Sequence, residues 1–142
     1  MSEGRILLVE DDEDDVAFVM RALTEIGAED RVDFARDGVE ALSFLHGDEP
    51  LPVAVILDLN LPGLDGHQVL ARIRAHERTA SLPVVVLTSS REESDVMRSY
   101  ASGVNSFVQK PVDFASFQEA VRKLALYWLD VNQPPRADPP PR

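Results

Sequence analysis

Residues 53–66 read VAVILDLNLPGLDG, and this stretch decides how the chain folds. An uninterrupted apolar run such as VAVIL is what a strand requires when both faces of its sheet are covered. The run ends at Asp58 and is followed by a Pro-Gly turn, after which Asp65 is placed to cap a helix. The stretch therefore predicts a buried parallel strand that leads through a turn into a helix.

The same order of strand and helix recurs along the rest of the chain. Apolar runs alternate with segments of helical spacing, and Gly27 and Gly47 close the first two of these helices. Strands are expected at 6–9, 32–34, 53–57, 84–87 and 106–108, with helices around 16–26, 39–45, 69–73, 96–100 and 114–128. Helical crossovers on both faces suit parallel strands, so we predict an α/β, doubly wound, five-stranded parallel sheet.

Composition and charge narrow the possible functions. The chain has 142 residues, 44% of them hydrophobic and 27% charged, which suits one globular domain and excludes wholesale disorder. A net charge of −11 repels phosphate backbones and anionic lipid, so neither nucleic acid nor a membrane surface is an expected partner. The absence of cysteine excludes disulfides and thiol chemistry, and no signal peptide or membrane span is visible. We expect a cytoplasmic protein.

The C-terminal segment differs from the rest in composition. Five of the ten prolines fall after residue 131. Such a segment forms neither helix nor sheet, so we expect an extended and mobile tail at 132–142. The folded domain is then expected to span residues 1–131.

Polar residues stand where the predicted strands end. Glu10 and Asp11 follow the first strand, Asp58 the third, Thr88 the fourth and Lys110 the fifth. The carboxyl ends of parallel strands share one edge of the sheet, which is where open α/β sheets bind ligands. Three converging carboxylates need a cation, and a hard ion such as Mg²⁺ takes oxygen ligands. A carboxylate can also act as a nucleophile and form an aspartyl phosphate.

The acidic run continues past the strand end. For residues 12–15, which complete EDDEDD at 10–15, we expect a solvated helix start whose charges complement the helix dipole. In the same way, Thr88 or Lys110 alone indicates little, because threonine is common in strands. The chemistry is predicted by their combination with the carboxylates.

Four motifs in order resemble the receiver domains of two-component response regulators. They are VEDD at 9–12, DLNLPGLDG at 58–66, VVLTSS at 85–90 and FVQKP at 107–111. The resemblance covers about residues 4–130. It implies the flavodoxin-like (βα)5 fold with strand order 2-1-3-4-5, and a signalling protein that catalyses only its own phosphorylation and dephosphorylation.

The resemblance also implies roles for single residues. Asp58 is expected to accept a phosphoryl group from a sensor histidine kinase, with Lys110 pairing with that group. The implied Mg²⁺ ligands are Asp11 and Asp58 directly, Glu10 through water and Asn60 through its backbone carbonyl.

Two further features follow from the resemblance. Thr88 and Phe107 match the switch pair, in which a hydroxyl moves to the phosphate and an aromatic ring turns inward. Phe107 lacks the hydroxyl of the tyrosine that also occurs at this position, and it could instead be a core aromatic. The bond between Lys110 and Pro111 is expected to be cis.

A finer resemblance concerns the partner. The loop at 46–52, HERTASLP at 76–83 and YWLDV at 127–131 resemble stand-alone receivers that partner bacterial phytochrome histidine kinases. We expect no effector domain after the last predicted helix, so that the signal leaves by protein contact or passes to another histidine.

The last helix predicts self-association. Six consecutive apolar residues, LALYWL at 124–129, point all around a helix axis and exceed what one face can bury. We therefore expect a homodimer through the fourth helix, fifth strand and fifth helix, using Tyr100, Leu126, Tyr127 and Leu129. The alternative is that this end packs over the edge of its own domain.

Three other classes remain as alternatives. An aspartyl-phosphate hydrolase typically carries a second acid two residues after its nucleophile, where this chain has Asn60. A flavin-binding module needs a phosphate loop after its first strand, and EDDEDD would repel the phosphate. A receiver that works without phosphorylation would not need the intact acidic cluster. The sequence lacks GxxxxGK[ST], which excludes a P-loop NTPase.

Overall fold

Five parallel strands form one sheet in the computed structural model, which describes residues 4–135. The strands are β1 (Ile6–Val9), β2 (Val32–Ala35), β3 (Ala54–Leu57), β4 (Val84–Thr88) and β5 (Ser106–Gln109). Their order is β2-β1-β3-β4-β5, and β1, β3 and β4 are buried along their whole length. Each strand lies within one residue of its predicted bounds. For β1, β3 and β4 the reason is that a continuous apolar run is a direct signal for a strand covered on both faces.

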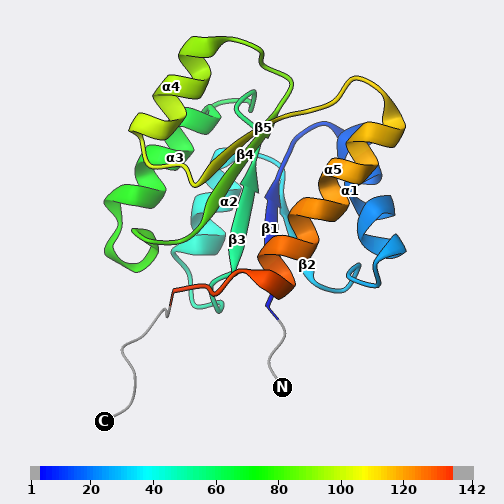
Figure 1. Cartoon of the computed structure of the whole chain (residues 1–142). Coiled ribbons are helices and arrows are strands. Elements are labelled where there is room, and N and C mark those ends of the chain that lie inside the picture. Colours follow the sequence, from blue (N-terminus) through cyan, green and yellow to red (C-terminus); the bar gives the residue numbers. More distant parts are fainter. Residues whose placement is uncertain (1–3, 136–142) are drawn as a thin grey trace.

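Five helices connect the strands and cover both faces of the sheet. They are α1 (Glu13–Glu25), α2 (Gly38–Leu45), α3 (Gly66–Ala75), α4 (Glu93–Ala101) and α5 (Phe114–Leu126). Helices α1 and α5 pack together on one face, while α2, α3 and α4 lie on the other (Figure 1). The doubly wound, flavodoxin-like fold predicted from the sequence is confirmed. None of the helices described is long and apolar enough to cross a bilayer.

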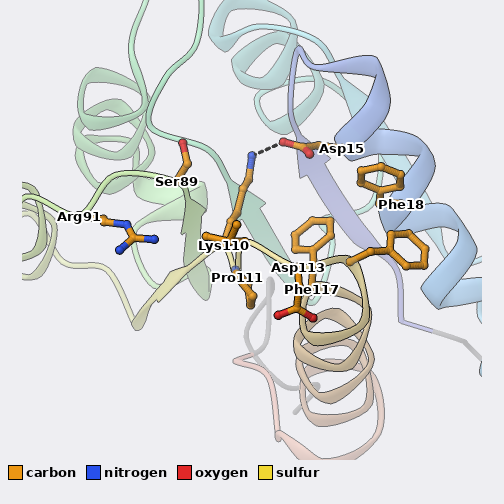
Figure 2. Close-up of a pocket in the computed structure, with 10 residues that line it drawn as sticks. Asp15, Phe18, Ser89, Arg91, Lys110, Pro111, Asp113 and Phe117 are labelled. Carbon is orange, nitrogen blue, oxygen red and sulfur yellow. Dashed lines mark hydrogen bonds and ion pairs between the residues drawn. The ribbon is translucent and has the colours of Figure 1, made fainter.

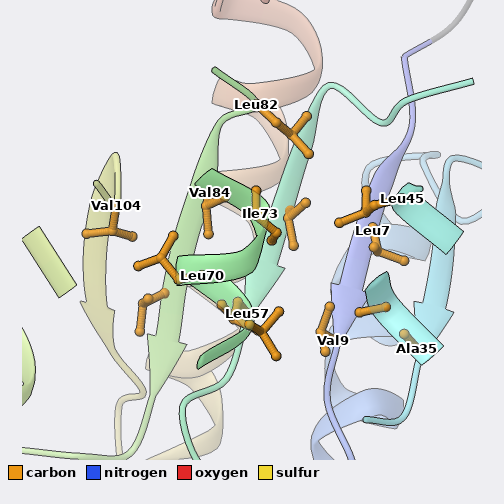
Figure 3. Packing of buried hydrophobic residues seen from close by; sticks show 14 of the residues in the cluster. Leu7, Val9, Ala35, Leu45, Leu57, Leu70, Ile73, Leu82, Val84 and Val104 are labelled. Atoms are coloured by element: carbon orange, nitrogen blue, oxygen red, sulfur yellow. The ribbon is translucent and has the colours of Figure 1, made fainter. Parts of the chain in front are cut away.

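Alternating side chains of the strands supply two cores. In β1, Leu7 and Val9 face α2 and α3, whereas Ile6 and Leu8 face α1 and α5. Figure 3 shows the first of these cores, where strand residues meet the side chains of α3 such as Leu70. Because successive strand residues point to opposite faces, one apolar run fills both cores and fixes the sheet between the helices.

The segment that decided the fold forms a tight connection from β3 to α3. Gly63 takes a positive φ of 73°, which completes the expected Pro-Gly turn. Asp65 caps α3, as predicted, and the structure shows that the cap is a capping box with Gln68. A Cβ atom at Gly66 would lie 2.5 Å from the carbonyl oxygen of Asp58, so only glycine lets α3 begin this close to the end of β3.

The C-terminal end packs on its own domain more than the sequence suggested. A π-helical turn, Tyr127–Val131, follows α5 and turns Trp128 onto Ala54 and Val85, so that its side chain is 8% exposed. Beyond it, Pro134 and Pro135 line a cleft of about 180 Å³ at the amino ends of the strands. The predicted tail lies mostly at 136–142, outside the described residues.

Candidate functional site

Three carboxylates meet at the carboxyl end of the sheet. Glu10 follows β1 and Asp58 follows β3, and these strands are neighbours, so the two side chains lie close together. With Asp11 they offer three carboxylate oxygens within 4.8 Å of one another. Glu10 and Asp58 are only 4% and 6% exposed, whereas Asp11 is open to solvent. The convergence predicted from the strand ends is therefore present.

Lys110 is the cation that faces this cluster. Its Nζ donates to Glu10 Oε1 at 2.7 Å and to Asp58 Oδ2 at 3.3 Å. Its backbone nitrogen donates to the carbonyl oxygen of Thr88 at 2.7 Å, which holds the lysine beside the end of β4. Burial raises the pKa of Glu10 to about 7, and the charge of Asp58 adds to this while the Lys110 hydrogen bond opposes it. The lysine therefore relieves only part of the repulsion.

The donor set fits a hard divalent cation. Carboxylate oxygens are what Mg²⁺ prefers, usually with one or two carboxylates and several waters. The site offers carboxylate oxygens from the buried residues Glu10 and Asp58 and from the solvent-exposed Asp11. This arrangement leaves room for water molecules to complete the coordination of the ion. Asn60 lies two residues beyond Asp58 and donates its backbone N–H to Asp58 Oδ1 at 3.3 Å. It therefore stands beside the cluster, and its carbonyl remains a predicted ligand.

The expected switch residues lie on the two neighbouring strands β4 and β5. Thr88 is fully buried, and its hydroxyl oxygen accepts a hydrogen bond from the backbone of Ser90 at 3.4 Å. Phe107 pairs with Val86 across the two strands and is half-buried against the core beneath α2 and α3. The ring is thus neither a fully buried core aromatic nor a free surface group.

A second polar network lies beyond Thr88. His67 of α3 bonds through Nε2 to Asp95 Oδ1 at 3.0 Å, and the Ser90 hydroxyl donates to Asp95 Oδ2 at 2.5 Å. The hydrogen bonds from Ser90 and then His67 lower the pKa of Asp95 below its ordinary value. The network joins the first turn of α4 to α3 and to the loop that follows Thr88, which sequence periodicity did not predict.

An open cleft of about 540 Å³ lies beside Lys110 and Asp15 (Figure 2). Part of its lining is apolar and exposed, with exposed fractions of 36% for Phe18, 41% for Phe114 and 86% for Val112. The rings of Phe18 and Phe114 meet edge to face at 5.1 Å. Phe114 is the first residue of α5, and it lines the cleft together with Phe117 one turn later.

Asp15 is the site residue that sequence reasoning missed. Its Oδ2 accepts from Lys110 Nζ at 2.6 Å, so the expectation of a merely solvated helix start is wrong for this residue. For Asp12 the expectation is confirmed, because its side chain caps α1 by accepting from the backbone of Asp14 and Asp15. The position of Asp15 in the chain could have indicated this contact, because the first turn of the helix after β1 lies beside the carboxyl end of that strand.

Two further expectations need correction. None of the peptide bonds described between residues 4 and 135 is cis, so the cis bond expected before Pro111 is wrong for this structure. The trans form is favoured for any X–Pro bond by about 0.5–1 kcal/mol. Of the residues expected at an interface, Tyr100, Leu126 and Tyr127 are exposed, but Leu129 packs against the core of α1 and α5.

Comparisons with known proteins agree with this geometry. The receiver domain of response regulators, as a family, matches residues 6–122. The probable methanogenesis regulatory protein FilR2 of Methanothrix harundinacea is 42% identical over 134 residues, covering 92% of this chain and 86% of that protein. Response regulator Rcp1 of Synechocystis sp. is 36% identical over 137 residues, covering 93% of each.

Solved structures give the same result. The phosphorylated cyanobacterial phytochrome response regulator RcpA superposes with a TM-score of 0.88 at 32% identity, over 95% of this chain and 100% of RcpA. The Mn²⁺-bound form of Rcp1 superposes with a TM-score of 0.85 at 34% identity, over 94% and 99% of the two chains. The motifs, the strand order and these relatives place the chain in the receiver-domain family of two-component response regulators.

Proposed function

We propose that this protein accepts a phosphoryl group on Asp58 from a sensor histidine kinase, in a reaction that requires Mg²⁺. The observation that carries the proposal is a carboxylate 6% exposed at the end of β3, with two further carboxylates and the Lys110 ammonium beside it. Membership of the receiver family supports the class of reaction. The protein then acts as a signalling component that catalyses only its own phosphorylation and dephosphorylation.

The transfer follows from the positions of Asp58 and its neighbours. A carboxylate oxygen of Asp58 attacks the phosphorus of a phosphohistidine, and the phosphorus–nitrogen bond breaks with its electron pair leaving on the imidazole. The backbone N–H of Asn60 orients one oxygen of Asp58, while Lys110 stands 3.3 Å from the other. Lys110 then offers its charge to the phosphoryl oxygens, and the Thr88 hydroxyl offers a hydrogen bond.

The proposed direct metal ligands are Asp11, Asp58 and the backbone carbonyl of Asn60, and Glu10 is proposed to act through a water molecule. When bound, Mg²⁺ neutralises charge on the oxygens of the transferred group. The Mn²⁺-bound structure of the relative Rcp1 supports a divalent cation in this family.

The proposed output is a change at β4 and β5. Thr88 closes on the phosphoryl group, and Phe107, already half-buried, turns further inward behind it. A partner protein then reads the altered surface. Because Phe107 lacks a hydroxyl, the change adds no exposed hydrogen-bonding group.

The proposed kinase partner is of the phytochrome type. Support comes from RcpA, whose structure is named as that of a phytochrome response regulator, and from the similarity to Rcp1 over 93% of both chains. The similarity to FilR2, a methanogenesis regulator by name, leaves other sensor kinases as the alternative. Three further features stay predictions: a domain that spans residues 1–131, a cytoplasmic location, and the absence of nucleic-acid or membrane partners.

We further propose a homodimer through α4, β5 and α5. Tyr100, Leu126 and Tyr127 remain 52%, 43% and 46% exposed, and burying such a side chain stabilises an interface by roughly 1.5–3 kcal/mol. Sedimentation at micromolar concentration is expected to give a dimer, and Tyr127→Glu a folded monomer that still phosphorylates. A wild-type protein that stays monomeric with and without phosphorylation rules the dimer out.

Intact mass after incubation with Mg²⁺ and acetyl phosphate tests the central proposal. The wild type is expected to gain one labile phosphoryl group, and Asp58→Asn, which keeps the volume but removes the nucleophile, to gain none. Asp12→Asn is the matched control, because it removes one exposed carboxylate outside the cluster. Equal labelling of wild type and Asp58→Asn overturns the assignment, and a wild type that never labels favours a receiver that works without phosphorylation.

A further inference from the structure

Lys110 makes its shortest contact outside the three-carboxylate cluster. Its Nζ lies 2.6 Å from Asp15 Oδ2, against 2.7 Å from Glu10 Oε1 and 3.3 Å from Asp58 Oδ2. Figure 2 shows the lysine side chain extended toward Asp15 at the start of α1. An ammonium group has three hydrogens, and these three carboxylates use all of them. The proposed phosphoacceptor therefore has the weakest hold on the lysine.

Asp15 is fixed in the place from which it reaches Lys110. It is the third residue of α1, and its backbone nitrogen donates to the capping carboxylate of Asp12 at 3.1 Å. Its side chain is 25% exposed and that of Lys110 is 10% exposed, so solvent screens the pair only partly. Asp14, one residue earlier in the same turn, is exposed and lies outside this contact.

We propose that Asp15 is a positioning residue that holds Lys110 in a resting place and sets how much of the lysine's charge reaches Asp58. This inference rests on the proposed function. On phosphorylation the lysine exchanges its contact with Asp15 for one with a phosphoryl oxygen, so Asp15 competes with the transferred group for the same ammonium hydrogens.

The charges around Lys110 support such a competition. Burial acts to lower the pKa of Lys110, but the hydrogen bonds with Asp15 and Glu10 and the charge of Asp58 outweigh it. Several carboxylates together therefore stabilise the charged form of Lys110, and no single one of them accounts for the whole effect. Removing the Asp15 charge leaves the lysine to Glu10 and Asp58, which are also the proposed metal ligands.

Two opposite effects are expected from Asp15→Asn. At saturating Mg²⁺, the initial rate of phosphorylation by acetyl phosphate rises about fivefold, as expected for a partly exposed ion pair. In that reaction the bond from phosphorus to acetate breaks, the bond to Asp58 forms, and acetate leaves. The Mg²⁺ concentration for half-saturation, measured by thermal stabilisation, rises about two- to fivefold, because the freed lysine competes better for Glu10 and Asp58.

A merely structural role predicts a different result. A loosened start of α1 would weaken Mg²⁺ binding and also slow phosphorylation. Asp14→Asn is the matched control, since it removes the same charge from the same helical turn, and both quantities are expected to stay within about twofold of wild type. Asp15→Glu, which restores the carboxylate, is expected to return both toward wild type.

A double-mutant cycle isolates the contact with the lysine. In a Lys110→Gln background, Asp15→Asn is expected to change the Mg²⁺ affinity no more than Asp14→Asn does. The inference is overturned if Asp15→Asn lowers the Mg²⁺ affinity in the Lys110→Gln background as much as it does in the wild type. It is also overturned if the wild type phosphorylates normally and Asp15→Asn phosphorylates no faster than Asp14→Asn. If the wild type never labels, the proposed function fails, and the Mg²⁺ cycle alone then decides whether Asp15 acts through the lysine.

Discussion

At the amino ends of the strands, Arg74 and Arg78 bind fixed backbone carbonyls, whereas at the carboxyl ends Lys110 is shared among carboxylates. Arg74 donates to the carbonyl oxygens of Leu82 and Gly103, each at 2.7 Å, just before β4 and β5. Arg78 binds three carbonyls in the segment from the end of α2 toward β3, at 2.6–3.0 Å.

The two ends of the sheet therefore use their cations differently, one end for stability and the other for reactivity. A guanidinium is a planar fork whose donors match several fixed acceptors at once, so it ties loops together permanently. A lysine ammonium is a compact charge on a flexible stem, and its carboxylate partners can accept a metal ion or release the lysine to another anion. The amino end is therefore expected to govern unfolding, and the carboxyl end to govern phosphorylation.

The largest expected effect is at the amino end. Arg74→Ala removes the donor to the carbonyl oxygens of Leu82 and Gly103 and to the side chain of Asn105, so the free energy of unfolding is expected to fall by about 3 kcal/mol. Arg72→Ala, an exposed position on the same helix, should change it by less than about 0.5 kcal/mol. Urea unfolding measures both. A phosphorylation rate per folded molecule that drops with Arg74→Ala would break the separation.

The next effect is at the carboxyl end. Lys110→Met removes the cation from between Glu10, Asp15 and Asp58, so the stability without Mg²⁺ is expected to fall by about 2 kcal/mol. Saturating Mg²⁺ should recover part of that loss, because the ion meets the same carboxylates. Lys123→Met, at a surface ion pair with the lysine side chain 74% exposed, is the control and should have little effect. A loss unchanged by Mg²⁺ contradicts the shared site.

The third effect is a pH dependence of metal binding. The pKa of Glu10 is raised to about 7, so below pH 7 a proton occupies the carboxylate that the ion needs. The apparent Mg²⁺ affinity is expected to fall about tenfold between pH 8 and pH 6. Because the pKa of Glu10 is higher in the folded state than in the unfolded state, protonation of Glu10 stabilises the fold. This stabilisation is lost as the pH rises through 7.

Isothermal titration across that range provides the measurement. Glu10→Gln should bind Mg²⁺ more weakly at pH 8 but with a much flatter dependence on pH. An equally steep profile in the variant assigns the titration to another group.

The smallest effect concerns the network beyond Thr88. The pKa of Asp95 is lowered, so ionised Asp95 stabilises the fold above its unfolded pKa of about 3.9, and this is lost as pH falls through the folded value. Asp95→Asn is expected to cost about 0.5–1 kcal/mol at pH 7, and this cost should shrink as the pH falls below about 3.9. Thermal unfolding at pH 7 and at lower pH values checks this, and a cost that does not shrink with falling pH contradicts it.

The doubly wound parallel sheet and the convergence of the carboxylates were predictable from local patterns, whereas the strand order was implied by the resemblance to receiver domains. Continuous apolar runs mark strands covered on both faces, and parallel strands bring their carboxyl ends to one edge. The sequence alone therefore predicts that Glu10, Asp58 and Lys110 lie together. The Asp65 cap was equally local, because a capping box depends on residues three apart.

What escaped prediction depends on packing between distant elements. Asp15 meets Lys110 across a separation of 95 residues, and the acidic run gave no reason to separate it from Asp14. The π-helical turn after α5 buries Trp128 and directs Leu129 onto the core, which counting apolar residues did not predict. Helical periodicity assumes a regular helix, so it fails where the winding changes.

Locating the phosphoryl group chemically is the most direct test of Asp58 as the phosphoacceptor. After reaction with acetyl phosphate and Mg²⁺, borohydride reduction converts a phosphorylated aspartate to homoserine, which peptide mass spectrometry can place in the chain. We expect homoserine at position 58, with Asp11 and Asp15 unchanged. Homoserine at Asp11 or Asp15 instead, with Asp58 intact, would contradict it.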